Sequence, residues 1–375
     1  MTSVSIRPAL PSERLALTAM LDRAFNKQLD ADRFANRYPH LFTDHRIVEH
    51  TLACDADVII GCVGCYQFPA MLNGISLTIA GIGQVGTVPE ARNRGIMTTM
   101  LNTAMATATE ADLLYLYGDR TRYGRVGFAP GGQTFCSMTW DRYAPPPGPG
   151  PLIRAVHLVR DATLIEQGFS QQALVIHQTP SERLANLSGK GLAGWTDGTA
   201  LILLSSDGSR VLLAMGAPAA IARLICHQVA QRVAINPADT GVTILADPRD
   251  AATVAAARLL GGSFSTRTTA MLRVGRLHPL LTAWANGVRP QPGATLTPCI
   301  LDGGSAGRVR ITVANNRYHI TPTTNQPDVS LDGAALAEVV FGTISPAISL
   351  PHVASDSALL GLLPMLFNIS ECYAL

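Results

Sequence analysis

The chain has 375 residues, which at about 150 residues per domain predicts two or three domains. Hydrophobic residues make up 47% of the sequence and charged residues 15%, so the chain is expected to bury sizeable cores and is not of the disordered class. With 29 basic and 27 acidic residues the net charge is +2, and the basic residues form no run of four or more. Composition therefore gives no indication of nucleic-acid binding.

Membrane and secreted classes are also disfavoured by the sequence. The longest apolar stretch, Val211–Ala222, is interrupted by Gly216 and Pro218 and is too short to cross a bilayer. Charged residues such as Arg7 and Glu13 stand where a signal peptide needs an apolar core. The seven cysteines are scattered, unlike those of a secreted disulfide scaffold. We expect a soluble cytoplasmic protein with reduced thiols and no membrane span.

Two proline-rich segments predict where the domains end. Pro145–Pro151 contains five prolines in seven residues, which favours an extended linker over a helix or a central strand. A second, softer boundary lies near Asn286-Gly287 and Pro290–Gly293. The predicted units are residues 1–144, 152–275 and 276–375.

The first unit alternates strands with helices. Its second helix, Arg92–Ala111, carries Ile96, Met100, Leu101 and Met105 on one side and follows directly on a long predicted strand. This order is typical of an α/β or α+β domain. The expected strands are Ser3–Ala9, Arg46–Ala53, Val58–Phe68, Ile75–Val88, Leu113–Tyr117 and Gln133–Trp140, and the first helix is Pro11–Phe25.

The remaining two units also contain segments with the apolar spacing of helices and segments with that of strands. The second opens with a hairpin around Asp207-Gly208, between Leu201–Leu204 and Val211–Met215. It continues with helices Pro218–Val233 and Asp250–Leu260 and strands Val242–Leu245 and Ser263–Val274. The third has helices Leu277–Asn286, Asp332–Phe341 and Asp356–Phe367 and strands Thr295–Leu301, Arg308–Val313 and Arg317–Thr321.

The segment from Ile82 to Ile96 carries the strongest chemical signal. It reads as a strand ending in Val88-Pro89, a short loop rich in Arg and Gly, and a long helix. The free N–H groups and the dipole at a helix N-terminus favour an anion such as pyrophosphate. Gly95 allows a close approach of the backbone, and Arg92 and Arg94 add charge-assisted hydrogen bonds.

This segment resembles the acetyl-CoA-binding motif V-x-P-x-x-R-x-x-G of the GNAT acetyltransferases. Met97 stands where the general motif has a small residue, but a bulky residue there is tolerated in the Eis-type (enhanced intracellular survival) branch. The stretch Tyr123–Phe128 is similar to the Eis-type motif Tyr-Gly-Arg-aromatic-Gly-aromatic, with Val126 replacing the first of the two aromatic residues. The resemblance implies acetyl-CoA as co-substrate, bound by Val85, Gly86, Thr87, Val88, Arg92, Asn93, Arg94, Gly95, Ile96, Met97 and Thr98, and no metal.

The Eis-type resemblance also implies an architecture. It predicts a catalytic GNAT domain, a second GNAT-like domain without a cofactor site, and a C-terminal sterol-carrier-like (SCP2-like) domain. The junction Leu212–Arg223 lacks Arg-x-x-Gly, so the second unit should not bind CoA. The segment Pro327–Asp332 is similar to the sterol-carrier-like fold. Relatives in this branch are often hexamers, so a homo-oligomer is expected.

The resemblance assigns roles in acetyl transfer to a primary amine of an aminoglycoside, a polyamine or a lysine side chain. Tyr123 would protonate the departing CoA sulfur, and the C-terminal carboxylate of Leu375 would be the general base. A backbone N–H of Val85–Val88 can stabilise the oxyanion. Two alternatives remain open: transfer of a longer acyl group or to a hydroxyl, and a lipid or sterol carrier whose GNAT domain is non-catalytic or regulatory.

Other polar residues of the sequence favour structural roles. Cys62 and Cys65 lie in a strand pattern that points them to opposite faces, and no second pair completes a zinc site. We therefore predict core cysteines. His40, His45 and His50 are spaced by five, which fits neither a helix face nor a strand face, and are predicted to be loop or surface residues.

Overall fold

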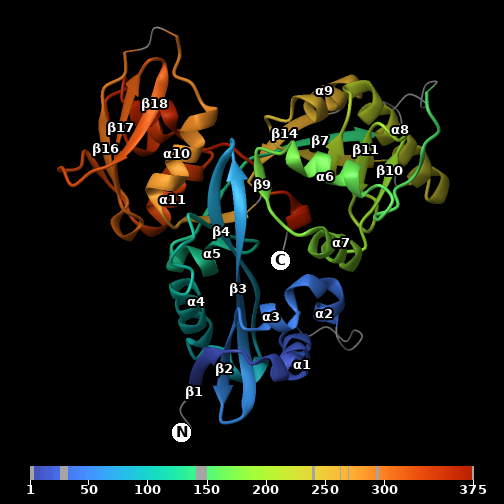
Figure 1. Cartoon of the computed structure of the whole chain (residues 1–375), viewed down its shortest axis with the longest axis horizontal. Helices are drawn as coiled ribbons and strands as arrows, with labels where there is room; N and C mark the ends of the chain where they lie inside the picture. Colours follow the sequence, from blue (N-terminus) through green and yellow to red (C-terminus); the bar gives the residue numbers. More distant parts are fainter. Residues whose placement is uncertain are drawn as a thin grey trace. The chain divides into compact units, whose positions relative to one another are not determined.

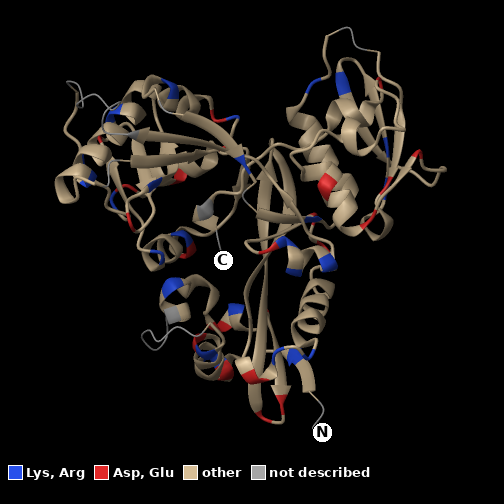
Figure 2. Ribbon diagram, turned by 180° about the vertical axis from the view of Figure 1, so that it is seen from behind, with Lys and Arg blue, Asp and Glu red and all other residues tan. Residues whose placement is uncertain are grey.

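The computed structural model describes residues 4–25, 33–140, 150–238, 241–261, 263–268, 270–292 and 295–373. The chain forms two compact units (Figure 1). The first contains Met1–Gly132 and Ala270–Met365, and the second contains Gln133–Thr269 and Leu366–Ala374. Basic and acidic positions are interspersed along both units (Figure 2). Among the described residues, no helix combines the length and the hydropathy that a membrane span requires.

The first unit is built on a mixed sheet with the strand order β1-β2-β3-β4-β5-β15-β6. All neighbouring strands are antiparallel except β4 and β5, which are parallel. Helices α1 and α4 both pack on β3, and Figure 1 shows them on opposite sides of the strands. The strands are β1 (Val4–Pro8), β2 (His50–Asp55), β3 (Val58–Leu72), β4 (Ile75–Thr87), β5 (Leu113–Leu116), β6 (Ala129–Gly131) and β15 (Ala270–Val274), and the helices are α1 (Arg14–Ala24), α2 (Arg33–Arg37), α3 (Asp44–Ile47), α4 (Ile96–Ala106) and α5 (Arg120–Tyr123).

The two parallel strands of this sheet separate part-way along their length. β4 and β5 pair from Ile79 and Leu113 to Ile82 and Leu116, where β5 ends. β4 continues to Thr87, paired only with β3 among the described strands. At Gln84 the backbone adopts φ of 48°, and the register with β3 shifts between Cys62 and Gly64. A bulge of this kind bends the strand, and it leaves an open backbone edge over Gly83–Thr87.

The C-terminal part of the first unit has a four-stranded sheet in the order β18-β17-β16-β19. It is linked to the β3–β4 turn through Asn73, whose side-chain amide donates to the carbonyls of Ala283 and Trp284 at 3.2 and 3.3 Å. Its sterol-carrier-like character stays a prediction. Its elements are α10 (Leu277–Gly287), β16 (Cys299–Asp302), β17 (Arg308–Ala314), β18 (Arg317–Pro322), β19 (Val329–Ser330), α11 (Gly333–Phe341), α12 (Pro346–Ser349) and α13 (Ala358–Leu362).

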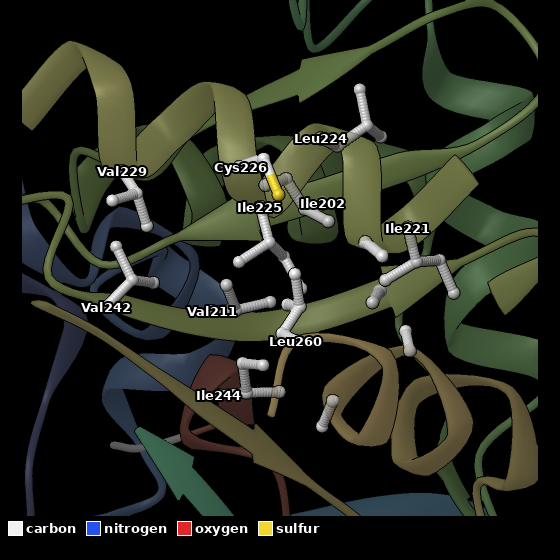
Figure 3. Close-up of a cluster of buried hydrophobic side chains, with 14 of the residues drawn as sticks. Ile202, Val211, Ile221, Leu224, Ile225, Cys226, Val229, Val242, Ile244 and Leu260 are labelled. Carbon is white, nitrogen blue, oxygen red and sulfur yellow. The ribbon is translucent and has the colours of Figure 1, made fainter. Parts of the chain in front are cut away.

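The second unit contains a seven-stranded sheet in the order β14-β7-β13-β12-β11-β10-β8. Helices α8 and α9 bury their apolar faces on it, and Figure 3 shows Ile225 of α8 beside Val211 and Ile244 of the sheet. The strands are β7 (Thr134–Trp140), β8 (Arg154–Ala155), β10 (Ala193–Thr196), β11 (Leu201–Leu204), β12 (Arg210–Met215), β13 (Gly241–Ala246) and β14 (Ser263–Arg267). Strand β9 (Leu174–Ile176) and helices α6 (Ala162–Ser170), α7 (Pro180–Gly189), α8 (Pro218–Ile235) and α9 (Ala251–Leu259) complete the unit.

Two strands pair differently from the expectation. The predicted strand Ser263–Val274 is two strands: β14 pairs with β7, whereas β15 pairs with β5 and β6 of the first unit. The segment Gln133–Trp140, expected to complete the first unit, supplies β7, which pairs with β13 and β14. An apolar alternating pattern indicates a strand but does not specify its partner. The expected helix Asp356–Phe367 is also shorter, because Pro364 follows α13.

Candidate active site

The predicted phosphate-binding loop joins β4 to α4. After a 3-10 turn over Pro89–Ala91, Asn93 and Gly95 both adopt the left-handed conformation, with φ of 62° and 75°. The helix then begins at Ile96, and its first hydrogen bond runs from the N–H of Thr99 to the carbonyl of Gly95 at 3.2 Å. The N–H groups of Ile96–Thr98 therefore have no partner inside the helix and are available to an anion.

The two arginines of this loop have different surroundings. Arg92 donates to the carbonyl of Ala24 at 2.7 Å and to that of Thr87 at 3.2 Å, so its guanidinium links the end of α1 to the end of β4. Among the described residues, the acidic partner of Arg94 is Asp55, at 3.9 Å, and the Arg94 side chain is about half exposed. An exposed pair at this distance contributes little. Arg94 is thus the more accessible cation, whereas Arg92 holds the loop in place.

The open edge of β4 presents backbone donors. The N–H of Val88 donates to the carbonyl of Ile60 on β3 at 3.0 Å. Successive N–H groups of a strand point to opposite edges, so the N–H groups of Thr87 and Val85 point away from β3. Within the predicted segment Val85–Val88, these two residues can donate to a ligand, and Val88 and Gly86 face their partner strand.

A cavity of about 440 Å³ adjoins this edge. We call it the β4–β5 cavity, because it begins where those strands separate. It is rich in aromatic rings and also contains charged groups. Its described lining residues are Phe25, Phe34, Arg37, Tyr38, Ile82, Gly83, Gln84, Val85, Leu116, Tyr117, Gly118, Asp119, Arg122 and Tyr123.

Tyr123 is held at the wall of the β4–β5 cavity by a one-turn helix. Asp119 caps α5 by accepting from the N–H of Thr121 at 2.6 Å, and the Tyr123 N–H donates to the Asp119 carbonyl at 3.1 Å. The ring packs edge-on against Phe128, with centroids 6.5 Å apart. Burial raises the pKa of the Tyr123 phenol, so it carries its proton throughout the neutral range.

A buried polar chain adjoins the β4–β5 cavity. The phenolic oxygen of Tyr66 lies 2.7 Å from Nε2 of His50 and 2.5 Å from the nearer atom of the Gln84 side-chain amide, and Gln84 is a lining residue. The expectation of a loop or surface position is wrong for His50, which is 0% exposed and lies in a strand. His40 lies in a short 3-10 turn, Pro39–Leu41, but is 3% exposed, so for it a surface position is wrong. Strand β2 begins at His50 and places it under the sheet surface. Burial lowers the pKa of His50 to about 4.

The C-terminal segment belongs to the second unit. There the parallel strands β12 and β13 pair only at Arg210–Val211 and Thr243–Ile244. Beyond that point the hydroxyl of Ser370 donates to the Leu212 carbonyl at 3.3 Å, and the N–H of Asn368 donates to Asp247 at 3.1 Å. The segment around Asn368–Ser370 therefore spans the gap between the two strands.

The end of the described chain is held by two buried side chains of α7 and the loop after it. Asn186 and Lys190 both donate to the Cys372 carbonyl, at 3.0 and 2.7 Å. Leu375, the predicted general base, lies outside the described residues.

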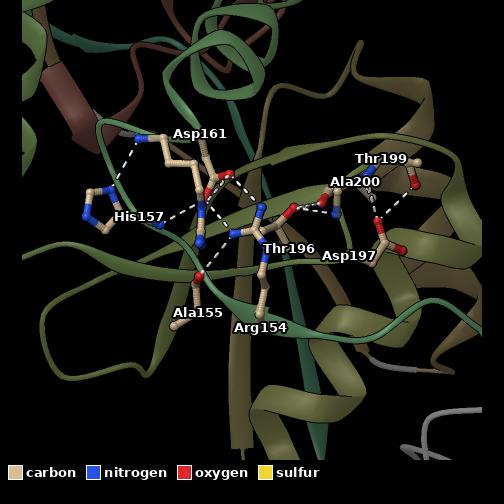
Figure 4. A network of polar contacts seen from close by, with 10 residues as sticks. Arg154, Ala155, His157, Asp161, Thr196, Asp197, Thr199 and Ala200 are labelled. Atoms are coloured by element: carbon tan, nitrogen blue, oxygen red, sulfur yellow. Dashed lines mark hydrogen bonds and ion pairs between the residues drawn. The ribbon is translucent and has the colours of Figure 1, made fainter.

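Polar groups of the second unit stabilise its own loops. Arg154 forms two hydrogen bonds of 2.7 Å with Asp161, and Asp197 accepts from the N–H groups of Thr199 and Ala200 (Figure 4). The hydrogen bonds from Arg154 lower the pKa of Asp161 to about 2. All seven cysteines are free, and the described residues contain no cluster of three or more His, Cys, Asp or Glu able to hold a metal.

Residues 5–131 match the family model described as the acetyltransferase (GNAT) domain. The chain carries a GNAT acetyltransferase domain. The prediction of an acyltransferase is therefore confirmed, and the domain holds the loop, the open strand edge and Tyr123 described above. No curated protein sequence matches the chain.

Solved structures extend the similarity to the whole chain. A GCN5-related N-acetyltransferase from Kribbella flavida matches with 18% identity and a TM-score of 0.71, covering 96% of this chain and 95% of that chain. One from Anabaena variabilis matches with 18% identity and a TM-score of 0.71, covering 98% of each chain. Eis1 from Mycobacterium abscessus matches with 15% identity and a TM-score of 0.66, covering 99% of each. The resemblance to the Eis-type branch is confirmed at the level of the fold.

Proposed function

We propose that the protein transfers the acetyl group of acetyl-CoA directly to a primary amine. The observation that carries this proposal is the grouping within one sheet of a backbone edge, an anion-binding loop and a buried phenol. The edge is Val85–Thr87, the loop is Arg92–Gly95, and the phenol is Tyr123 at the wall of the β4–β5 cavity. Together they supply a thioester-binding groove, a phosphate site and a proton donor.

The cofactor would bind to β4 and the start of α4. An extended pantetheine arm can pair with the free N–H groups of Val85 and Thr87 in the manner of an added strand. Its pyrophosphate would be bound by the N–H groups of Ile96–Thr98 and by Arg94, with Arg92 and Asn93 shaping the loop. Gly86 packs against the end of α1. A Cβ atom at this position would lie 3.2 Å from side-chain atoms of Ala24 and Phe25 and 3.5 Å from Leu21, so the site has little room for a larger residue.

The transfer has a balanced sequence of bond changes. The amine nitrogen attacks the thioester carbonyl, forming a C–N bond, and the C–S bond then breaks. The carbonyl oxygen gains negative charge in between, which a free N–H of β4 stabilises. Tyr123 donates its proton to the departing thiolate, the amine loses one proton to a base, and Tyr123 recovers a proton from solvent. Ordinary phenol and thiol pKa values of about 10 and 8.5 are close enough for this exchange.

The base that we propose is the C-terminal carboxylate of Leu375. In its support, the chain is fixed three residues earlier by Asn186 and Lys190 at the Cys372 carbonyl. A terminal carboxyl has an ordinary pKa of about 3.5, so it needs a raised pKa or a water relay to deprotonate an amine. Deleting the last two residues should abolish amine acetylation while leaving acetyl-CoA binding intact, and an active truncated enzyme would refute this role.

The acceptors that we propose are aminoglycosides, polyamines or lysine side chains. The test is a free-thiol assay with purified protein, acetyl-CoA and these three amine classes. We expect thiol release that depends on an amine, with one CoA released per acetyl group found on the product. Acetyl-CoA binding without amine-dependent release would refute these acceptors. If the protein neither binds acetyl-CoA nor releases CoA, the acetyltransferase proposal is refuted.

We also propose a cytoplasmic location, a homo-oligomer and a sterol-carrier-like C-terminal part over residues 276–375. Free thiols on all seven cysteines fit a reducing compartment. Light scattering during size exclusion tests the oligomer, and a monomeric mass would refute it.

A further inference from the structure

Three adjacent strands place His50, Tyr66 and Gln84 in one buried row. Across β2, β3 and β4 the residues His50, Gly64 and Gly83 pair in register. A Cβ atom on Gly64 would lie 2.2 Å from the Tyr66 hydroxyl, so only glycine at this position leaves room for the phenol. Tyr66 and His50 are fully buried, and Gln84 is 5% exposed.

The geometry fixes the tautomer of His50. Its Nδ1 lies 3.0 Å from the carbonyl oxygen of Ile47, which can only accept, so Nδ1 carries a hydrogen. Burial keeps the imidazole neutral at pH 7 because its pKa falls to about 4. Nε2 is then a bare acceptor.

The single hydroxyl hydrogen of Tyr66 is used by this acceptor. The Tyr66 hydroxyl donates to Nε2 of His50 at 2.7 Å, so the phenolic oxygen has no hydrogen left for Gln84. The amide atom of Gln84 that lies 2.5 Å away must therefore be the donating nitrogen. Nitrogen and oxygen of a side-chain amide have nearly the same shape, and their assignment follows from the hydrogen bonds that they make.

The second amide atom of Gln84 is then the carbonyl oxygen. That atom is buried and has no hydrogen-bond partner among the residues that the structure describes. A buried acceptor without a partner is costly, so its retention needs an explanation. Gln84 lines the β4–β5 cavity. Because Tyr123 lies at the wall of the same cavity, we place the acceptor amine of the proposed reaction there.

We propose that the side-chain carbonyl of Gln84 accepts a hydrogen bond from the attacking amine, and that Tyr66 and His50 hold the amide in this orientation. The inference rests on the proposed function. One N–H of the amine on this carbonyl turns its lone pair toward the thioester. The bond strengthens as the nitrogen gains positive charge during attack, so it favours the transition state over the ground state. Gln84 takes no proton, because an amide does not titrate in this range.

The test compares three variants with a matched control, using amine-dependent release of CoA. Gln84→Met keeps the length of the side chain and removes the carbonyl. We expect kcat/KM for the amine to fall about 10- to 100-fold, as for loss of a hydrogen bond to a charged group. The KM for acetyl-CoA should stay within about two-fold, because the loop and α4 are untouched. Gln67→Met, on β3 beside Tyr66 and outside the cavity lining, should keep wild-type activity.

Two further variants separate an orienting role from a structural one. Gln84→Glu retains an acceptor oxygen, so it should recover most of the activity that Gln84→Met loses and add a new ionisation to the pH profile of kcat/KM. Tyr66→Phe should lower kcat/KM about 3- to 10-fold, because the amide is no longer held. The double variant should be no worse than Gln84→Met alone, since Tyr66 acts through Gln84.

Each outcome decides the inference. It is overturned if Gln84→Met retains wild-type kcat/KM, if Gln84→Glu is as impaired as Gln84→Met, or if the two single losses multiply in the double variant. These results leave acetyl transfer by the wild type in place. A wild-type protein that releases no CoA with any amine refutes the proposed function, and the inference with it.

Discussion

Replacing Gly118 by alanine should move Tyr123 without touching the cofactor loop. Gly118 follows β5 and lines the β4–β5 cavity. A Cβ atom there would lie 2.2 Å from Cε2 and 2.8 Å from Cδ2 of Tyr123. Its φ is not in the left-handed region, so the backbone accepts alanine. The third nearby atom, Cδ1 of Leu116 at 3.0 Å, is the end of a flexible side chain, so most of the effect falls on the Tyr123 ring.

The size of the effect follows from these distances. Carbon atoms pack at about 3.5–4.0 Å, so the ring must move by roughly 1.5 Å. A displacement of about 1 Å at a reacting group costs on the order of 100-fold in rate. We therefore expect kcat to fall about 100-fold. Overpacking of this kind also lowers the free energy of unfolding by about 1–3 kcal/mol.

The assay is free-thiol release with acetyl-CoA and an accepted amine, together with calorimetric binding of acetyl-CoA. Gly124→Ala is the matched control, because Gly124 also adjoins Tyr123, has helical φ and ψ, and has no atom within 4 Å of the place that an alanine methyl group would occupy. It should keep wild-type kcat. A folded Gly118→Ala protein whose kcat is within two-fold of wild type would refute the idea that the position of Tyr123 controls the rate. Equal losses of kcat in Gly118→Ala and Gly124→Ala would mean that disturbance of α5, and not displacement of the ring, lowers the rate.

Four other changes test the site and the buried chain. Tyr123→Phe should lower kcat by about 100-fold or more while acetyl-CoA still binds, and equal kcat in the variant and the wild type would contradict the role of Tyr123 as proton donor. Because burial raises the pKa of this phenol, the wild-type rate should fall at alkaline pH only above about 10. Arg94→Gln should raise the Kd of acetyl-CoA about 10-fold with little change in kcat, and an unchanged Kd by calorimetry would remove Arg94 from the phosphate site. Lys190→Met should remove one donor from the Cys372 carbonyl, leaving that of Asn186, and so loosen the C-terminal segment and lower kcat more than it alters acetyl-CoA binding, whereas unchanged kcat would speak against a base at the C-terminus. The pKa of His50 is about 4 in the folded protein and about 6.5 in the unfolded chain, so the unfolded state takes up a proton first as the pH falls. Up to about 3 kcal/mol of the free energy of unfolding should therefore be lost between pH 6.5 and pH 4. If denaturant unfolding of His50→Gln shows the same pH dependence, His50 is not its source.

The parts of the fold that were predictable from sequence are those that local chemistry dictates. Gly95 stands between a predicted strand that ends at Val88-Pro89 and a run of apolar residues at helical spacing. Its left-handed conformation and the helix after it follow from that position. The position of Tyr123 followed only from its family motif. Which strands pair was harder to predict, because the sequences of β7 and β15 both indicate only an apolar strand and their partner strands are distant in sequence.

The buried row at Gln84 was missed for a related reason. His50 lies within the predicted strand Arg46–Ala53, but its spacing to His40 and His45 was given more weight and suggested a loop or surface position. The signal that was present is the pair Gly64 and Gly83, since glycine inside a strand often marks a close approach of other groups. Only the register across three strands brings these glycines, the phenol and the amide together.

The segment that spans the gap between β12 and β13 has a consequence for biosynthesis. The second unit draws its body from Gln133–Thr269 but closes that gap with the segment around Asn368–Ser370, which is synthesised after all the strands of the unit. During translation its parallel strands are complete long before the peptide that fills the space between them. Domains generally fold as they emerge, N-terminal parts first, and exposed apolar gaps in such intermediates invite aggregation. Emergence of this segment from the ribosome is therefore the step that completes the second unit, and chains truncated before Leu366 should be the forms that depend most on chaperones.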